Sequence, residues 1–368
     1  MTKYILFSFC ALLFFVNADC KDEPPTKDNG KNLPDTTSHN FTWQTFTWGG
    51  GGSSSINDVA ILSDTDIWVV GDIQLSDSIA QDGSGHNFPF GAAHWDGIEW
   101  KLFRLPVFVS PTYTTYLIPT GIIAFSSTDI WFASGGVHRF NGTQVTESYW
   151  LADWPGNPQT PILSQEQRIE KLWGSSSNNI YAVGRSGAIA HYNGSSWQKL
   201  ESGTTLDLHD IYGATNDKTG EQQILAVGSR NLPFDRVILR VQGTSVTTLS
   251  SDSIEYELSG VWFKPDQHYY VVGDGIFEKN TLNENTWKNK PLDITPYYTA
   301  GITGNDVNDV FVVGAYGECL HWNGVSWLSF REQTYVGNGG FGKVAMKENL
   351  VVAGGYDSQN AVLVMGKR

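Results

Sequence analysis

The sequence predicts an all-β fold: a seven-bladed β-propeller of four-stranded antiparallel blades, closed by an N-terminal strand that completes the last blade. Three observations predict it. A short apolar pattern recurs along the chain, turn dipeptides follow most copies at a fixed distance, and the last copy lacks a strand that a segment near the N-terminus can supply. The composition agrees, because 39 of the 368 residues are Gly and 14 are Trp, whereas only 17% are charged, below the roughly 25% of ordinary globular proteins.

The recurring pattern is a strand of six residues that ends in glycine, as in the segment Asp-Ile-Trp-Val-Val-Gly at residues 66–71. Its copies end at Gly71, Ser134 (a degenerate copy), Gly184, Gly228, Gly273, Gly314 and Gly354. Successive ends are 63, 50, 44, 45, 41 and 40 residues apart, close to the length of about 40–50 residues of a four-stranded propeller blade. The pattern therefore predicts one copy per blade and seven blades.

Each copy is predicted to be the second strand of its blade. A short strand precedes it, and a third strand follows it and ends in Asp-Gly or Asn-Gly at 96–97, 141–142, 193–194 and 323–324. These dipeptides favour the type I′ hairpin turn, in which both central residues have positive φ. A large apolar residue three positions after the turn glycine opens the fourth strand: it is Trp100, Val145, Trp197, Val246 or Trp327.

The last unit has only three strands, at 343–346, 349–353 and 361–365, before the chain ends. Its missing strand is predicted near the N-terminus, where residues 40–44 match 194–198 in the offset and character of their tryptophan. An open ring would expose strand edges, which promote aggregation. We therefore expect residues 40–47 to form the outer strand of blade seven, and the propeller to span residues 40–368 as one domain.

Residues 1–20 are predicted to be a signal peptide of the lipoprotein type. Lys3 precedes an apolar run of thirteen residues at 4–16, which is too short for a membrane span of about 20 residues. Cys20 follows the run in the place of a lipidated cysteine, although the residues three and one before it depart from the usual lipoprotein box. The alternative is ordinary cleavage after Ala18.

Residues 21–39 are polar and lack apolar periodicity, so we expect a disordered tether. The sequence Cys-Lys-Asp-Glu at 20–23 resembles the acidic signal that sends some Bacteroidetes-type lipoproteins to the cell surface. The predicted location is the cell envelope or the cell surface, as an outer-membrane lipoprotein, with a periplasmic or secreted protein as the alternative. Contact with a membrane is expected through the lipid anchor only.

Charge and motifs argue against several functions. The net charge of −14 disfavours nucleic acid as a partner. The sequence has no phosphate loop, nucleophile elbow, HExxH or CxxC motif, so it predicts no cofactor and no catalytic residue. Cys319 is predicted to be a small buried hydrophobe, since no second cysteine is expected near it in the propeller.

Two sets of polar residues could suggest a metal, and both are predicted to be structural. His94, His191 and His321 occupy the same place in separate blades, so they cannot meet around one ion, and we expect each to bond to a neighbouring strand. The second set lacks the spacing of a calcium loop, and its short side chains are typical of turns. Its members are Asp64, Asp66, Asn305, Asp306, Asn308 and Asp309.

Insertions in blades one to three are the best candidate for a binding site. They span 73–90, 103–119 and 147–167, and they leave the same face of a propeller, on which loops often bind ligands. Aromatic side chains beside a carboxylate suit contacts with a protein or a glycan, although these aromatic residues could instead cap the core. The predicted binding residues are Tyr113, Tyr116, Trp150, Asp153 and Trp154.

The repeat at 173–197, with Trp-Gly, then Asn-Ile-Tyr-Ala-Val-Gly, then His-Tyr-Asn-Gly-Ser-Ser-Trp, resembles a family of secreted bacterial seven-bladed propeller lipoproteins. These are loosely similar to photosystem II assembly-factor-like and neuraminidase-repeat propellers. The resemblance covers nearly the whole mature chain, but the Asp-box of sialidases is absent. We expect a monomeric, non-enzymatic binding or assembly scaffold for a protein or glycan. The alternatives are a glycan- or peptide-active enzyme with its site at the channel mouth, and a structural propeller within a larger envelope complex.

Overall fold

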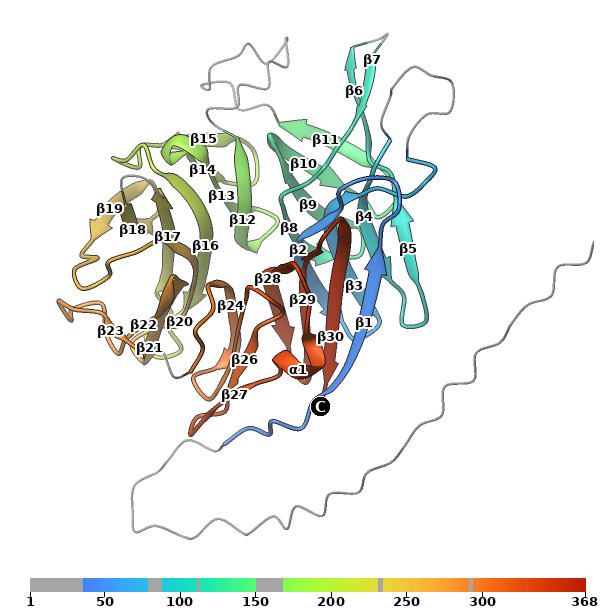
Figure 1. Ribbon diagram of the computed structural model, residues 1–368. Helices are drawn as coiled ribbons and strands as arrows, with labels where there is room; N and C mark the ends of the chain where they lie inside the picture. The colour runs from blue at the N-terminus through green and yellow to red at the C-terminus, as the bar shows by residue number, and fades with distance from the viewer. Residues whose placement is uncertain (1–35, 79–87, 111–112, 150–167, 231–233, 291–293) are drawn as a thin grey trace, which may run out of the picture. The chain divides into compact units, whose positions relative to one another are not determined.

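The computed structural model describes residues 36–78, 88–110, 113–149, 168–230, 234–290 and 294–368. In this part of the chain the strands form seven four-stranded antiparallel sheets and one two-stranded sheet. The arrangement confirms the predicted fold, a seven-bladed β-propeller (Figure 1). The described residues contain no helix that is both long enough and apolar enough to cross a membrane.

The blades follow one another along the chain, and each runs from an inner first strand to an outer fourth strand. Blades one to three contain β2 (Ser55–Ser63), β3 (Asp66–Ile73), β4 (Phe90–Trp95) and β5 (Trp100–Phe103); β8 (Gly121–Ser126), β9 (Asp129–Ser134), β10 (Gly136–Phe140) and β11 (Val145–Tyr149); and β12 (Ile169–Ser176), β13 (Asn179–Gly184), β14 (Ile189–Tyr192) and β15 (Trp197–Leu200).

Blades four to six have the same order, and blade seven takes its fourth strand from the other end of the chain. They contain β16 (Asp207–Thr215), β17 (Gln222–Arg230), β18 (Asp235–Gln242) and β19 (Ser245–Leu249); β20 (Leu258–Lys264), β21 (His268–Gly273), β22 (Gly275–Lys279) and β23 (Lys288–Asn289); β24 (Thr299–Asp306), β25 (Asp309–Gly314), β26 (Cys319–Trp322) and β27 (Trp327–Ser329); and β28 (Gly339–Lys347), β29 (Leu350–Asp357), β30 (Asn360–Lys367) and β1 (Thr42–Trp48).

The first strands contact one another in a closed ring around the propeller axis, and β28 contacts β2 to complete it. Among the described residues, seven clusters of buried apolar side chains fill the seven interfaces between neighbouring blades. Strands alternate in direction, so second-to-third-strand connections and blade-to-blade connections leave one face, which we call the upper face. The first-to-second and third-to-fourth turns form the lower face.

Strand β1 closes the ring as the sequence predicts. It pairs with β30 over seven positions, from Thr42 opposite Lys367 to Trp48 opposite Ala361, so the first and last strands of the propeller lie side by side in Figure 1. Trp43 packs into the core between blades six and seven, and Phe46 into the core between blades seven and one. The strand therefore satisfies the edge of β30 and seals two interfaces at once.

The glycine that ends the repeat pattern allows two strands to approach closely. A Cβ atom on Gly71, Gly184 or Gly273 would lie 1.9–2.0 Å from a backbone carbonyl oxygen at the start of the first strand of the same blade. No larger residue therefore fits at these three positions. In blade seven the residue at this place is Gly355, whose Cβ would lie 1.9 Å from the Gly340 oxygen. The predicted register of blade seven, which ends at Gly354, is therefore wrong by one residue.

The predicted type I′ turns are also wrong. In the Asp-Gly and Asn-Gly turns only the glycine has positive φ, as at Gly97 (φ +94°) and Gly194 (φ +91°). The side-chain oxygen of Asn193 instead accepts hydrogen bonds from the backbone N–H groups of Ser195 and Ser196, both at 3.0 Å. The backbone N–H of Asn193 donates to the Ser196 carbonyl. Such side-chain bonds hold the turn with one left-handed residue rather than two.

Three features of the insertions and of the propeller start differ from those expected. Tyr149 lies at the end of β11 and packs on the core of blades two and three, so it belongs to a strand and not to an insertion. The insertion at 103–119 contains a hairpin of β6 (Pro106–Ser110) and β7 (Tyr113–Tyr116). Contacts with blade six begin at Thr37, three residues before the expected start of the propeller.

Gly273→Ala should destabilise the protein by more than about 2 kcal/mol, because its methyl group would overlap backbone atoms of the neighbouring strand. Gly342→Ala is the matched control, since it has open space and no positive φ, and should change stability by less than about 1 kcal/mol. Urea unfolding of both variants checks this. Equal losses of stability would contradict the close-approach explanation.

Candidate functional site

The inner strands place one residue per blade in a ring around the propeller axis. These residues pair with corresponding positions of the second strands, and in six blades they directly follow a β-bulge. A bulge redirects the side chain that follows it and is common beside functional sites. The ring consists of Asp58, Gly121, Lys171, Asp210, Gly260, Gly301 and Lys343, in blade order.

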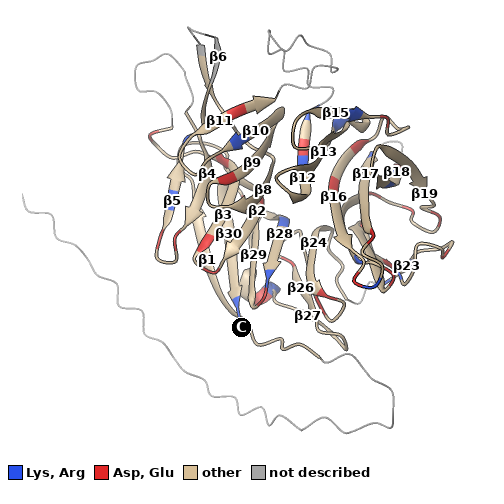
Figure 2. Cartoon of the chain, turned by 180° about the vertical axis from the view of Figure 1, so that it is seen from behind, with Lys and Arg blue, Asp and Glu red and all other residues tan. Residues whose placement is uncertain are grey.

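Four charged members of the ring form ion pairs between blades. The Lys171 Nζ atom donates to both carboxylate oxygens of Asp58 at 2.7 Å, although the two residues lie in blades three and one. The ring position between them, in blade two, is Gly121, which has no side chain to block this path. The Lys343 Nζ atom lies 3.7 Å from Asp210, and the ring positions between those two blades are also glycines. Figure 2 shows the acidic and basic positions along these strands.

Both ring carboxylates also accept backbone N–H groups of the next blade. Ile122 donates to Asp58 at 2.9 Å and Val261 donates to Asp210 at 3.1 Å. Burial alone would lower the pKa of Lys171, but the charges of Asp58 and Asp210 outweigh it and raise that pKa. The carboxylates are therefore committed to lysines and to the backbone, and they give no support to an acid–base pair in the channel.

The repeat histidines have the structural role that the sequence predicts. The Nε2 atom of His94 lies 2.8 Å from Asp66, and that of His321 lies 2.9 Å from Asp309; His191 contacts Asn179 at 2.8 Å. In each case the partner is the first residue of the second strand of the same blade. Two members of the expected turn set, Asp66 and Asp309, therefore each anchor a histidine. Within the described ranges no three His, Cys, Asp or Glu side chains converge as metal ligands.

Cys319 is fully buried in the core between blades six and seven, as the sequence predicts. Burial raises the pKa of its thiol, and the charge of Glu318 raises it further. A thiol that stays protonated in an apolar environment is a poor nucleophile. The residue therefore contributes packing.

The predicted binding residues fall mostly outside the described part of the chain. Trp150, Asp153 and Trp154 lie outside it, as does Cys20, and Tyr113 is described only through the backbone pairing of β7. Tyr116 is described, and its ring contacts Phe88 edge-to-face at 5.2 Å. The predicted binding site therefore stays a prediction, and whether its five residues lie close together is not tested.

The base of the insertion in blade one is held by Arg104. Its guanidinium group donates to the Phe88 carbonyl at 2.9 Å, lies 3.9 Å from the centre of the Phe90 ring and pairs with Asp77 at 3.0 Å. The described aromatic residues of this insertion therefore pack on one another and on a cation. Of these residues, Phe90 also packs on the core between blades seven and one, whereas the capping alternative for the remaining insertion aromatics stays a prediction.

A second group of aromatic residues on the upper face is not predicted from the sequence. Nine large hydrophobic side chains are exposed among the described residues, and six of them lie on the upper face of blades four to seven, five in connections and one near the end of β29. We call these six the aromatic surface: Phe234, Tyr256, Tyr298, Tyr316, Tyr335 and Tyr356. They are single residues spread over six separate segments, so only a comparison of equivalent segments across blades could have found them.

A buried carboxylate holds the connections that carry the aromatic surface. Glu318 is 2% exposed, and it accepts the hydroxyl of Thr295 at 2.6 Å and that of Ser329 at 2.5 Å. Three segments of the upper face are thereby joined to one group. The next segment, α1 (Arg331–Thr334), places the Arg331 guanidinium 4.6 Å from the Tyr297 ring and 5.1 Å from the Tyr335 ring. The aromatic side chains are therefore presented on a fixed base.

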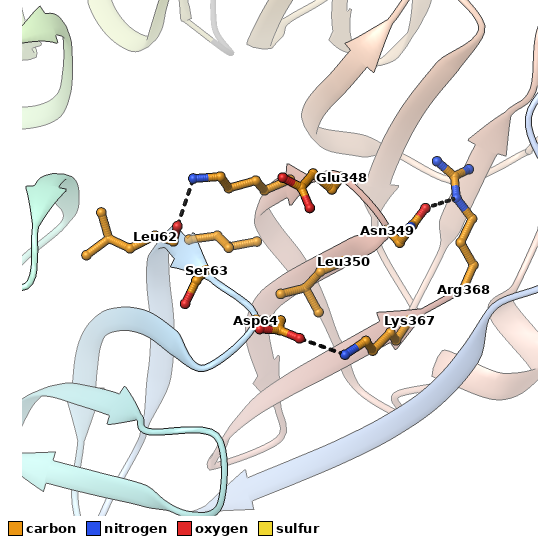
Figure 3. A pocket seen from close by; sticks show the side chains of 10 residues that line it. Leu62, Ser63, Asp64, Glu348, Asn349, Leu350, Lys367 and Arg368 are labelled. Carbon is orange, nitrogen blue, oxygen red and sulfur yellow. Dashed lines mark hydrogen bonds and ion pairs between the residues drawn. The ribbon is translucent and has the colours of Figure 1, made fainter.

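A cavity of about 360 Å³ lies on the lower face between blades seven and one (Figure 3). Its cations all have partners: Lys347 donates to the Leu62 carbonyl at 2.7 Å, Lys367 pairs with Asp64 at 2.9 Å, and Arg368 donates to Asn349 at 3.0 Å. The charged groups around the cavity therefore tie the C-terminal strand to its neighbours.

Comparisons with known proteins show the fold. No protein-family model matches the chain, and no curated protein sequence matches it. The structure of YCF48 bound to a D1 peptide is similar, with a TM-score of 0.62, 15% identity, and coverage of 90% of this chain and 99% of that one. YCF48 from Cyanidioschyzon merolae has a TM-score of 0.57, 14% identity and coverage of 88% and 98%. The WD40 propeller domain of Doa1 has a TM-score of 0.57, 11% identity and coverage of 89% and 97%.

Lys171→Met should lower the free energy of unfolding by about 3–5 kcal/mol, because it leaves the buried Asp58 carboxylate without its cation. Adding Asp58→Asn should recover much of this loss. Lys367→Met is the control, since it breaks an exposed pair with Asp64, and its melting temperature should stay near that of the wild type. A double variant as unstable as Lys171→Met alone would contradict the coupling.

Proposed function

We propose that this chain is a non-enzymatic binding scaffold that is lipid-anchored through Cys20 outside the cytoplasm and presents its upper face to a protein partner. One observation carries the proposal: six of the nine exposed large hydrophobic side chains among the described residues gather on the upper face of blades four to seven. Exposed aromatic residues on a rigid scaffold are typical of protein interfaces. A similar propeller, YCF48, has been solved with a D1 peptide bound, which makes a polypeptide the first partner to test.

The lower face is where the N-terminal segment joins the propeller. The Thr37 N–H donates to the Asn323 carbonyl at 3.2 Å, and the Thr37 hydroxyl donates to the Asn308 carbonyl at 2.6 Å. Both carbonyls belong to lower-face turns of blade six. In the proposal, the chain that leads from Cys20 therefore joins the propeller at the lower face, on the side opposite the aromatic surface.

The N-terminal segment is fixed further by a pair of histidines. The Nδ1 atoms of His39 and His321 lie 2.8 Å apart, so one must be neutral and accept the proton of the other. Burial, and to a smaller extent the neighbouring His321, lower the pKa of His39 to about 4. His39 is therefore neutral near pH 7, where its hydrogen bond with His321 can form. This bond helps to hold residues 37–39 against the lower face.

The enzyme alternative has less support. The ring carboxylates Asp58 and Asp210 are paired with lysines and with backbone N–H groups. A glycan-active site would need two carboxyl groups free to act on substrate. The aromatic surface supports binding, and nothing in the ring supports chemistry.

Capture of envelope proteins by the immobilised full chain tests the binding proposal. The triple variant Tyr256→Ala, Tyr316→Ala, Tyr335→Ala should reduce capture of a bound protein by about tenfold or more, because exposed aromatic anchors dominate interface energy. The lower-face variant Ile98→Ala, Val325→Ala, Leu328→Ala removes equally exposed apolar side chains and should leave capture unchanged. Loss in both variants, or in neither, contradicts a binding role for this part of the upper face.

Two further arms of the same experiment test the rest of the proposal. The double variant Trp150→Ala, Trp154→Ala shows whether the predicted insertion residues add to the capture of envelope proteins. Binding of the purified protein to immobilised glycans tests the glycan alternative. Metabolic labelling with a fatty-acid analogue tests the anchor: Cys20→Ser should lose the label, and equal labelling of this variant would contradict lipidation.

A further inference from the structure

The aromatic surface extends over four neighbouring blades, and contacts join its members in two groups. Phe234 contacts Tyr256 edge-to-face at 6.0 Å, and Tyr297 contacts Tyr316 at 5.5 Å. Arg331 stacks between Tyr297 and Tyr335. The Tyr316 N–H donates to the Gly339 carbonyl at 2.8 Å, and Gly339 pairs with the residue that follows Tyr356. The side chains therefore form an arc along the upper rim of blades four to seven.

Tyr316 lies in this arc with an unusual backbone conformation. Its φ is +58° and its side chain is 46% exposed. A bulky residue in the left-handed region is uncommon, because its Cβ crowds the backbone, and such strain is concentrated at binding surfaces. The turn could place a glycine here at lower cost, as it does at the next residue, Gly317 (φ +77°). A tyrosine at this position therefore costs some conformational stability but exposes an aromatic ring on the upper face.

Two carboxylates flank Tyr298 in the middle of the arc. Glu257 and Tyr298 occupy equivalent positions, each directly before the first strand of its blade. The Glu257 carbonyl lies against Gly273, and the Tyr298 carbonyl lies against Gly314. The Asp274 N–H donates to the Glu257 carbonyl at 3.2 Å. Burial of its hydroxyl raises the pKa of Tyr298, a hydrogen bond from Ser259 lowers it, and the charges of Glu257 and Asp274 raise it. The geometry places these segments together. The hydroxyl of Thr299, the residue after Tyr298, donates to the Gly273 and Gly275 carbonyls on either side of Asp274, at 2.8 and 3.1 Å. The Ser259 hydroxyl, two residues after Glu257, donates to the Thr299 carbonyl at 3.1 Å.

These carboxylates lack a cation among the described residues, whereas the nearby cations are occupied. Neither Glu257 nor Asp274 forms an ion pair within the described ranges. Arg236 donates to the Glu255 carbonyl at 3.2 Å, and Lys290 pairs with Glu278 at 2.8 Å. Arg331 is stacked between two tyrosines. The middle of the arc thus combines aromatic faces with uncompensated negative charge, in a chain of net charge −14.

We propose that the aromatic surface binds an extended polypeptide segment that contains lysine or arginine, with one cationic side chain placed against Tyr298 between Glu257 and Asp274. The inference deepens the proposed function and rests on it. A cation gains from the ring face and from the carboxylates together, and the remaining tyrosines supply flat amphipathic contacts along an extended chain. A neutral glycan could stack on the rings and donate hydroxyl hydrogen bonds to the carboxylates, but it would leave their negative charge without a cation.

The test measures binding of labelled peptides to the purified full chain by fluorescence anisotropy. The probes are peptides of alternating Lys and Ser, Gln and Ser, or Glu and Ser, together with a neutral oligosaccharide. We expect the Lys-Ser peptide to bind about tenfold more tightly than the Gln-Ser peptide, and the Glu-Ser peptide to bind most weakly. Added salt should reduce the difference, because the carboxylates are near the surface.

Matched variants locate the site. Glu257→Gln with Asp274→Asn should bring the Lys-Ser affinity down to the Gln-Ser level, whereas Glu99→Gln with Glu348→Gln, which removes the same charge from the lower face, should leave it nearly unchanged. Tyr298→Phe should retain binding and Tyr298→Ala should lose it, because the ring face and not the hydroxyl meets the cation. Equal losses in the two acid-to-amide variants would show only a general charge effect and overturn the site.

Four other outcomes also decide the matter. Equal affinity for Lys-Ser and Gln-Ser peptides overturns the cationic specificity, and tighter binding of the neutral oligosaccharide overturns the polypeptide. If no peptide binds while the aromatic triple variant still loses captured envelope protein, the inference fails and the proposed function stands. If the triple variant also captures normally, both fail.

Discussion

The hydrogen-bonded pairing of β1 with β30 is the interaction on which the rest of the structure depends. The apolar core of each blade packs only on its two neighbours, through one cluster of buried side chains per interface, so these interfaces form a complete set only if the ring is closed. Residues 42–48 close it by satisfying the edge of the last blade and by placing Trp43 and Phe46 in the interfaces on either side. Without this strand an unpaired edge would be exposed.

A closed ring also explains how the two faces differ. The charged ring residues bridge blades one with three and four with seven, and they fix the inner strands without leaving a free carboxylate among them. The lower face then receives the N-terminal segment at Thr37 and the C-terminal residue Arg368, which pairs with Asp309. The upper face is left to carry exposed aromatic side chains on connections that Glu318 holds together. The direction of the strands therefore places the exposed aromatic side chains on one face and both ends of the described propeller on the other.

The repeat made the fold predictable, since the spacing of one six-residue strand sets the number of blades, and the missing strand points to its replacement at the N-terminus. Details that depend on backbone conformation were not predictable in this way. The turn at Asn193 uses side-chain bonds instead of a second positive φ, and blade seven places Gly355 where the sequence pattern favours Gly354. The charged ring could not be predicted, because a β-bulge precedes most of its members and Lys171 reaches past a whole blade to Asp58. Long insertions drew attention to blades one to three, whereas the described aromatic surface uses single residues in short connections.

Deletion of residues 36–48, followed by thermal unfolding with and without the same segment added as a peptide, tests the closure most directly. If β1 closes the ring, the truncated chain should melt lower, by on the order of 10 °C or more, since it loses two partly buried aromatic anchors and a strand of hydrogen bonds. The free peptide should restore much of the loss by binding only the folded form. A truncated chain that melts like the full protein and ignores the peptide would contradict the claim that this strand holds the propeller together.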